Sequence, residues 1–171
     1  MKEFEFLRIA ETENAEYSFQ EKKVDLGGGA RSPYIIHLLK LKYKGCLITI
    51  KNETGTSFNG LITCVIQTQK KSLTFQLTTR SHLTTLFSKN NQRFKIESGN
   101  ININNFLKNS NSIALLNEIA KKDTFEPQIT GKYEDDVYKL ITEYSLQFSD
   151  WIQVLQPFID FYKEFIDTFE G

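Results

Sequence analysis

The chain has few of the residues on which crosslinks, metal sites and nucleophilic catalysis usually depend. Its 171 residues include two cysteines, two histidines and three prolines. A chain of this length can bury a core without disulfides, and His37 and His82 do not lie at a metal-binding spacing. We expect no metal and no cofactor.

Long apolar runs are also missing. No stretch reaches about 18 uncharged apolar residues, so the sequence predicts no integral membrane segment. The N-terminus alternates acidic and aromatic residues from Glu3 to Phe6, unlike the basic and apolar start of a signal peptide. The expected compartment is therefore the cytoplasm.

The net charge of zero conceals a segregation of charge along the chain. Residues 31–100 carry eleven Lys and Arg side chains against two acidic ones. Residues 1–30 carry four against seven, and residues 101–171 carry six against twelve. A basic middle between acidic flanks is a guide to partners and solubility rather than to fold.

The basic middle predicts an antiparallel β-meander over residues 34–79. Its strands, 34–43, 46–51 and 58–68, are separated by turn-forming residues, and a last strand follows the turn at 69–72. If each turn closes a hairpin, the first one pairs Tyr43 with Cys46, Leu41 with Ile48, and Leu39 with Ile50. The second pairs Cys46 with Cys64 and Ile48 with Ile62, and the third pairs Ile66 with Phe75 and Cys64 with Leu77. These residues form an apolar core face, and the opposite face carries Lys40, Lys42, Lys44, Thr49, Lys51, Thr63, Gln67, Thr74, Gln76 and Thr78.

The flanking segments predict a mixture of strands and helices. Before the meander we expect strands over 4–10 and 17–26. After it we expect a helix over 81–89 capped by Ser81, a short strand over 92–97, and a loop leading into a helical turn over 100–111. A helix over 112–122 and a strand pair over 128–132 and 137–148 follow. The last element is a helix from Trp151 to Phe169 capped by Asp150. Pro157 should kink or restart that last helix.

These elements predict one α+β domain over residues 1–171. It combines a predominantly antiparallel β-meander sheet with C-terminal helices packed on one face. The basic, β-rich part spans residues 31–100, and the acidic, helix-rich part spans residues 101–171. No repeat or Pro/Gly-rich linker favours a further division.

Two basic features are candidate binding sites. Lys40, Lys42, Lys44 and Lys51 predict a basic sheet face that suits nucleic acid, although lysines also protect solvated strands against edge-to-edge pairing. The second feature is a glycine-rich loop, and its possible anion ligands are Gly28, Gly29, Arg31 and Ser32. Because Pro33 and a β-rich run follow instead of a helix, a loop that reaches a partner fits better than a phosphate cradle.

The C-terminal helix is a candidate partner surface. Its apolar stripe is wider than one packing surface needs, and its partner-facing residues would be Trp151, Phe158, Phe161 and Phe165. Packing across the apolar face of the sheet is the interpretation that we favour for this stripe. The exposed acids of the helix have the wrong sign for an anionic membrane.

The remaining polar groups give no catalytic motif. Cys46 and Cys64 suggest a cross-strand disulfide, but in a cytoplasmic protein two reduced core cysteines fit better. An enzyme would have to use Arg31, Ser32, His37, His82 or the acidic run 134–136.

The sequence therefore favours a non-enzymatic cytoplasmic protein-interaction module of the adaptor, inhibitor or immunity type. It would bind a protein partner or a second copy of itself. A nucleic-acid-binding protein that uses the basic sheet face is the alternative, and an enzyme without a recognisable motif is a third possibility.

Overall fold

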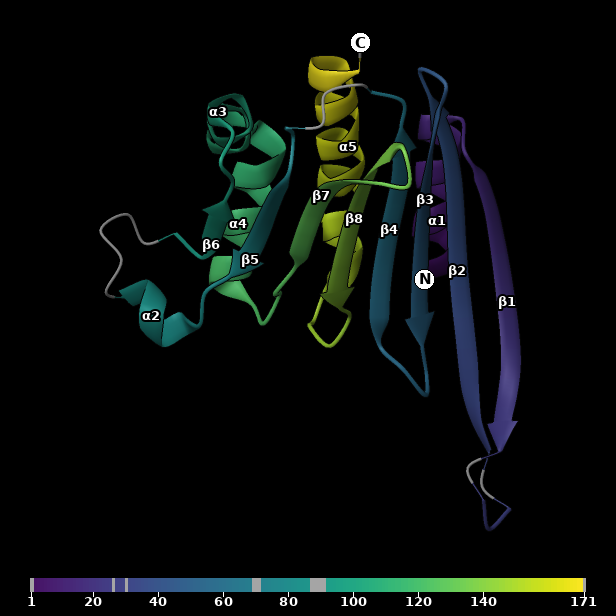
Figure 1. The fold of residues 1–171 in the computed structure, drawn as a ribbon. Helices are drawn as coiled ribbons and strands as arrows, with labels where there is room; N and C mark the ends of the chain where they lie inside the picture. The colour runs from purple at the N-terminus through teal and green to yellow at the C-terminus, as the bar shows by residue number, and fades with distance from the viewer. Residues whose placement is uncertain (1, 26, 30, 69–71, 87–91, 171) are drawn as a thin grey trace.

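The computed structural model describes all residues except 1, 26, 30, 69–71, 87–91 and 171. The described residues form an eight-stranded antiparallel sheet with the order β1-β2-β3-β4-β8-β7-β5-β6 (Figure 1). The strands are β1 (Glu16–Asp25), β2 (Arg31–Tyr43), β3 (Cys46–Thr54), β4 (Asn59–Ile66), β5 (Phe75–Thr79), β6 (Phe94–Glu97), β7 (Gln128–Glu134) and β8 (Val137–Ser145). The helices are α1 (Lys2–Glu13), α2 (His82–Leu86), α3 (Ile101–Asn109), α4 (Asn111–Lys122), the 3₁₀ helix η1 (Trp151–Val154) and α5 (Leu155–Phe169).

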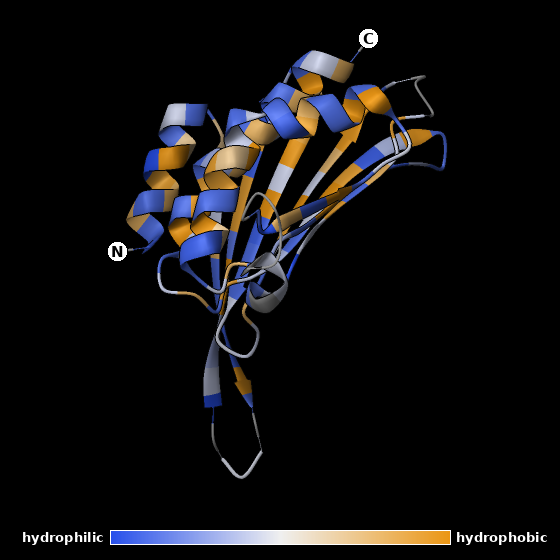
Figure 2. Ribbon diagram, turned by 90° about the vertical axis from the view of Figure 1, so that its left-hand side faces the viewer, coloured by the Kyte–Doolittle hydropathy of each residue, from blue (hydrophilic) through white to orange (hydrophobic). Residues whose placement is uncertain are grey.

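The fold is α+β, as expected, with the C-terminal helix packed on one face of the sheet. Helices α1, α4 and α5 lie on the same side, as Figure 2 shows. The Phe165 ring of α5 stacks on Tyr138 of β8 at 5.6 Å and lies 5.9 Å from Phe75 of β5. We call the covered side of the sheet the inner face and the other side the outer face. In the described part of the chain, no helix covers the outer face.

The first hairpin of the meander is confirmed in every pair. Tyr43 lies opposite Cys46, and Leu41 and Leu39 lie opposite Ile48 and Ile50. Lys44 and Gly45 both have positive φ, 46° and 81°, as a two-residue type I′ turn requires. The predicted core face is also correct, because all its residues are buried except Tyr43, which is half-buried.

The two later pairings of the meander are wrong. Strand β4 is shifted by two residues, so Cys64 lies opposite Ile48 rather than Cys46. A shift of two residues keeps each side chain on its face, and the hydrophobic pattern therefore does not detect it. Strands β4 and β5 do not pair at all, because the β7–β8 hairpin lies between them. Ile66 consequently faces Tyr138, and Leu77 faces Ile129.

The first predicted strand is also wrong, since residues 2–13 form helix α1. A strand would place Phe4 and Phe6 on one face, yet Phe4 is 68% exposed and Phe6 is fully buried. The buried residues Phe6, Ile9 and Ala10 follow helical spacing instead. Asn14 ends the helix in the left-handed conformation, with φ of 50°.

One further segment differs from expectation, while the C-terminal helix shows the restart that Pro157 predicted but lacks the predicted Asp150 cap. The asparagine-rich stretch is helix α3 rather than a loop, because Asn100 caps it by accepting hydrogen bonds from the Asn102 and Ile103 amides. The C-terminal helix restarts at Leu155 after η1, with Pro157 in its first turn, where a missing amide proton costs little. Asp150 makes no capping hydrogen bond.

The other flanking elements agree with the sequence. Strand β1 covers most of residues 17–26, and residue 26 lies outside the described residues. Ser81 accepts a hydrogen bond from the Thr84 amide at the start of α2, while residues 87–89 of the predicted helix lie outside the described residues. Strand β6, helix α4 and the β7–β8 hairpin lie where they were expected.

The Tyr162 hydroxyl fixes α5 to the middle of the sheet. It is fully buried, donates to the Ile62 carbonyl oxygen of β4 at 3.1 Å, and lies 3.0 Å from Thr142 Oγ1 of β8. We expect Tyr162→Phe to lower the free energy of unfolding by about 1–2 kcal/mol, since two buried polar groups lose a partner. Urea unfolding monitored by circular dichroism measures this change.

Tyr43→Phe is the matched control for that variant. The Tyr43 hydroxyl donates to the Asp167 carboxylate at an exposed site, so its loss should leave the unfolding midpoint close to that of the wild type. Equal effects of the two substitutions would contradict the anchoring role of Tyr162.

Candidate functional site

The predicted basic residues do not form one free cationic surface. Lys40 and Lys42 lie exposed on the outer face, as expected. Lys51 is also on this face but pairs with Glu53. Lys44 lies in the β2–β3 turn and reaches the helix side, where its Nζ is 2.6 Å from Asp167 of α5.

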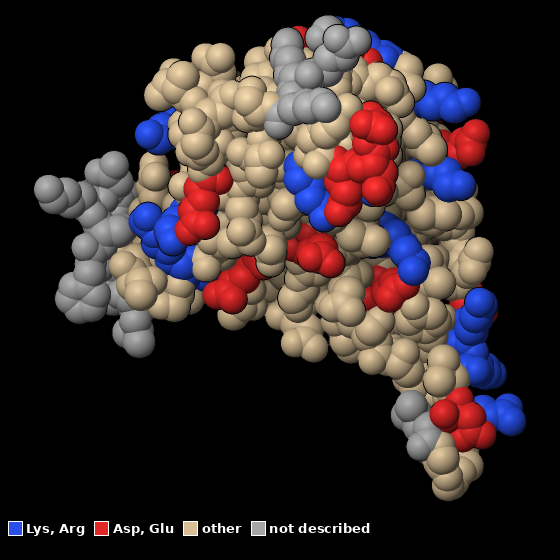
Figure 3. Space-filling view, in the orientation of Figure 1, with Lys and Arg blue, Asp and Glu red and all other residues tan. Residues whose placement is uncertain are grey.

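Ion pairs neutralise most of the other lysines on the outer face. Lys139 Nζ lies 2.6 Å from Asp135 and 3.2 Å from Glu134, and Lys95 pairs with Glu97. Hydrogen bonds to Asp135 and Glu134 raise the pKa of Lys139, and the bond from Lys51 lowers the pKa of Glu53. Figure 3 shows basic and acidic side chains interspersed over this side of the molecule. Its surface is therefore of mixed charge.

Exposed apolar side chains lie between these charges. Leu47, Leu61 and Val65 are 45%, 37% and 46% exposed. The strand register places Leu47 beside Lys42, Val65 beside Lys139, and Leu61 between Lys51 and Glu143. Apolar groups bordered by charged ones are typical of a surface that contacts another protein.

A hollow of about 500 Å³ adjoins Leu61, one of these exposed apolar residues. Leu61 and Lys51 form part of its wall, together with Gly60 and Tyr144. Gly60 has no room for a Cβ atom, which would lie 2.2 Å from the Tyr144 ring. The hollow is large enough to hold a partner's side chain, as the central pockets of protein interfaces do.

Sequence reasoning did not single out Leu47, Leu61 or Val65, although a signal was present. Residues 61–66 form an almost continuous apolar run, Leu-Ile-Thr-Cys-Val-Ile. A strand with only one buried face should alternate apolar and polar residues, so a continuous run indicates that both faces carry apolar side chains.

The glycine-rich loop lies at the tip of the β1–β2 hairpin, which extends beyond the rest of the sheet in Figure 1. Gly28 and Gly29 have φ of 61° and 82°, and an added Cβ would meet no atom within 4 Å. Arg31 faces Asp25 across the hairpin, and the Ser32 hydroxyl contacts the Pro33 carbonyl oxygen. No helix N-terminus adjoins these described residues, so the anion ligands that a phosphate cradle needs do not converge here.

The aromatic residues of the C-terminal helix lie in the core. Trp151, Phe158, Phe161 and Phe165 are at most 1% exposed. The apolar stripe of this helix is thus used for packing across the sheet, which was the favoured interpretation. The expected exposed apolar patch near Trp151 or Phe161 is not present among the described side chains.

The possible catalytic residues are dispersed. Arg31 and Ser32 lie at the hairpin tip, His37 is buried under α1, and His82 is exposed at the start of α2. The acidic run 134–136 lies in the β7–β8 turn, where it binds lysines. Cys46 and Cys64 are both free.

The described residues contain neither a metal-binding cluster nor a membrane-spanning helix. No group of three or more His, Cys, Asp and Glu side chains could hold a metal ion. No described helix is both long enough and apolar enough to cross a membrane.

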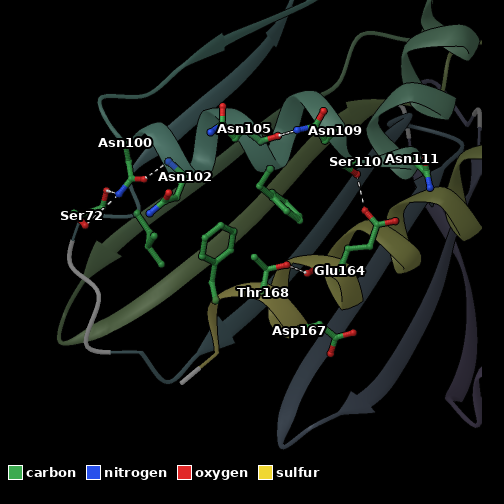
Figure 4. A pocket seen from close by; sticks show the side chains of 13 residues that line it. Ser72, Asn100, Asn102, Asn105, Asn109, Ser110, Asn111, Glu164, Asp167 and Thr168 are labelled. Atoms are coloured by element: carbon green, nitrogen blue, oxygen red, sulfur yellow. Dashed lines mark hydrogen bonds between the residues drawn. The ribbon is translucent and has the colours of Figure 1, made fainter.

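A groove of about 870 Å³ separates α3 from the end of α5 (Figure 4). Asn102, Asn105 and Asn109 line one wall. The two carboxylates of the other wall already have partners. Glu164 accepts bonds from the Ser110 and Ser112 hydroxyls at 2.6 and 2.7 Å, and Asp167 binds Tyr43 and Lys44. We therefore assign no catalytic acid or base to this groove.

The chain was compared with family models, curated proteins and solved structures, and none of them matched. Function must accordingly be inferred from the molecule's own surfaces.

One buried titratable group has a predictable effect on stability. His37 of β2 is 4% exposed, stacks on Phe6 of α1 at 4.6 Å, and its Nδ1 lies 2.8 Å from the Tyr17 hydroxyl. Burial lowers the pKa of His37 below its ordinary value of 6.5; nearby Lys2 lowers it further, and Glu3 opposes this shift.

His37 of the unfolded chain binds a proton more readily than His37 of the folded protein. The contribution of neutral His37 to the free energy of unfolding is therefore fully present above pH 6.5 and is lost as the pH falls below that value. We expect wild-type protein to lose stability between pH 6.5 and 5 in urea titrations, and His37→Gln to lose less over the same range. His82→Gln, which changes the exposed histidine, is the control and should follow the wild type. Parallel pH profiles for wild type and His37→Gln would contradict this prediction.

Proposed function

We propose that the protein is a non-enzymatic, cytoplasmic protein-interaction module of the adaptor, inhibitor or immunity type, and that its partner binds the outer face of the sheet. The observation that carries this proposal is the group formed by Leu47, Leu61 and Val65 on a face that no described helix covers. Burying these side chains against a partner removes apolar surface from water, which is the main favourable term in association.

The pattern of charge supports a protein partner over nucleic acid. Phosphate binding depends on cations that are free to replace counterions. On the outer face Lys51, Lys95 and Lys139 are already paired with carboxylates, whereas Lys40 and Lys42 have no ion pair within the described residues. A mixed surface of this kind suits a partner that carries both signs of charge.

Site-specific photocrosslinking in the source cells tests the proposal. A photoreactive phenylalanine analogue replaces Leu61 or Val65 on the outer face. Leu115, which is 55% exposed on α4, is the matched control on the helix side. We expect a discrete protein adduct from positions 61 and 65 and none from position 115, because only the first two positions would be covered by the partner.

The alternatives give different results. An adduct that nuclease removes, and that is lost in a Lys40→Glu/Lys42→Glu variant, would show that the outer face binds nucleic acid. Equal adducts from all three positions, or none from any, would show that this face is not a partner surface. Thermal unfolding of each variant checks that the sheet is intact.

A further inference from the structure

The outer edge of strand β1 is unpaired. Among the described elements, only β2 pairs with β1, which lies at the end of the sheet (Figure 1). The strand is ten residues long, and its exposed edge presents a row of backbone amide and carbonyl groups. Such an edge is a template for pairing with another strand.

The Lys44-Gly45 turn determines which residues of β1 direct their backbone groups to this edge. In a two-residue type I′ hairpin, the flanking residues Tyr43 and Cys46 form a hydrogen-bonded pair. Odd-numbered residues of β2 therefore bond to β3, and even-numbered ones bond to β1. By the β1–β2 register, the even residues of β1 bond to β2. Tyr17, Phe19 and Glu21 then direct their amide and carbonyl groups outward.

We propose that β1 pairs in antiparallel orientation with β1 of a second copy of this chain, about a two-fold axis at Phe19. The hydrogen-bonded pairs are Phe19 with Phe19 of the second copy, and Tyr17 with Glu21 of the second copy. Each of these pairs uses the outward groups identified above and exchanges two N–H···O=C bonds. The two sheets become one continuous sheet.

Charge complementarity selects this register. It places Glu16 opposite Lys22 of the second copy, and symmetry repeats the pair. An axis at Glu21, Lys22 or Lys23 would bring that residue against its own copy and so oppose like charges. An axis at Ser18 or Gln20 pairs no opposite charges. Among these registers, only the one centred on Phe19 pairs opposite charges and no like charges within β1.

The position of α1 also fits this pairing. The Phe6 ring of α1 lies 5.5 Å from Tyr17 of β1 and 4.6 Å from His37 of β2, so α1 lies astride the two strands. The two copies of α1 would therefore lie on the same side of the joined sheet, one on each side of the proposed axis.

The exposed apolar side chains near this edge lie where such a contact needs them. Lys2, Glu5 and Arg8 line a cavity against η1 and α5, which identifies the side of α1 that faces the rest of the molecule. With about 3.6 residues per turn, Leu7 lies on the opposite side of α1, toward the edge of the sheet. Leu7 is 44% exposed and Phe19 is 39% exposed. Glu3 shares that side of α1, so the two helices repel each other in part and the dimer is a weak one.

Sedimentation of the purified full chain over a range of concentrations tests the proposal through charge reversal. The wild type should show a concentration-dependent equilibrium between monomer and dimer. Lys22→Glu and Glu16→Lys should each weaken the dimer about tenfold, because two attractive pairs become two repulsive ones. The double variant Glu16→Lys/Lys22→Glu should recover the dimer. Lys42→Glu, on β2 away from the edge, is the control and should leave it unchanged.

A backbone variant tests the hydrogen bonds independently. The Glu21 amide faces the free edge, so Glu21→Pro removes a bond to the second copy without removing one to β2. We expect loss of the dimer with a circular dichroism spectrum like that of the wild type. A protein that remains monomeric up to its solubility limit would overturn the proposal. So would a dimer that Lys22→Glu and Glu21→Pro leave intact.

Discussion

The pairing of β4 with β8 is the constraint on which the rest of the structure depends. It places the C-terminal hairpin between β4 and β5, so two strands from the acidic C-terminal part of the chain lie between strands of the basic part. Helix α5 follows β8 and crosses the inner face at this point, where the Tyr162 hydroxyl binds groups from both strands. Residues far apart in the sequence must therefore meet before the core closes, which predicts slow folding for a domain of this size.

One consequence is that all the packing helices lie on the inner face. The aromatic residues that the sequence suggested for a partner, Trp151 and Phe161 among them, are needed there to cover a sheet of eight strands. The outer face and the edge of β1 are among the surfaces that the described helices leave uncovered. The fold also reduces the segregation of charge, because it brings Lys44 and Arg93 of the basic part to Asp167 and Glu126 of the acidic part. A basic segment of the sequence is consequently not a basic surface of the fold.

The sequence predicted the local features well and the long-range pairings poorly. The β2–β3 hairpin was predictable because its two-residue turn fixes one register, and the inner face was predictable because alternation survives a shift of two residues. Because alternation does not change on a shift of two residues, it could not show that Cys64 lies opposite Ile48. Nothing local distinguishes β8 from β5 as the neighbour of β4, since both offer apolar residues at alternate positions. Helix α1 was not predicted because the residues Glu3-Phe4-Glu5-Phe6 alternate between charged and apolar, as in a strand. The buried residues of this segment are nevertheless spaced as in a helix. The charge of the candidate site could not be predicted because the sequence gives the number of lysines but not the carboxylates that pair with them. The apolar run 61–66 predicted the residues of the inner face, and its exposed residues on the outer face were not recognised.

The two proposed surfaces are related through the symmetry of the sheet. A two-fold axis perpendicular to the plane of the sheet at Phe19 keeps the outer faces of both copies on the same side of the joined sheet. The exposed residues Leu47, Leu61 and Val65 of the two copies would then lie on the same side of the joined sheet, separated by the β1 and β2 strands of both copies. A partner with two matching sites would bind such a dimer more tightly than two monomers, because its second contact is intramolecular. A weak β1 contact is compatible with this arrangement, since binding of a divalent partner would itself stabilise the dimer.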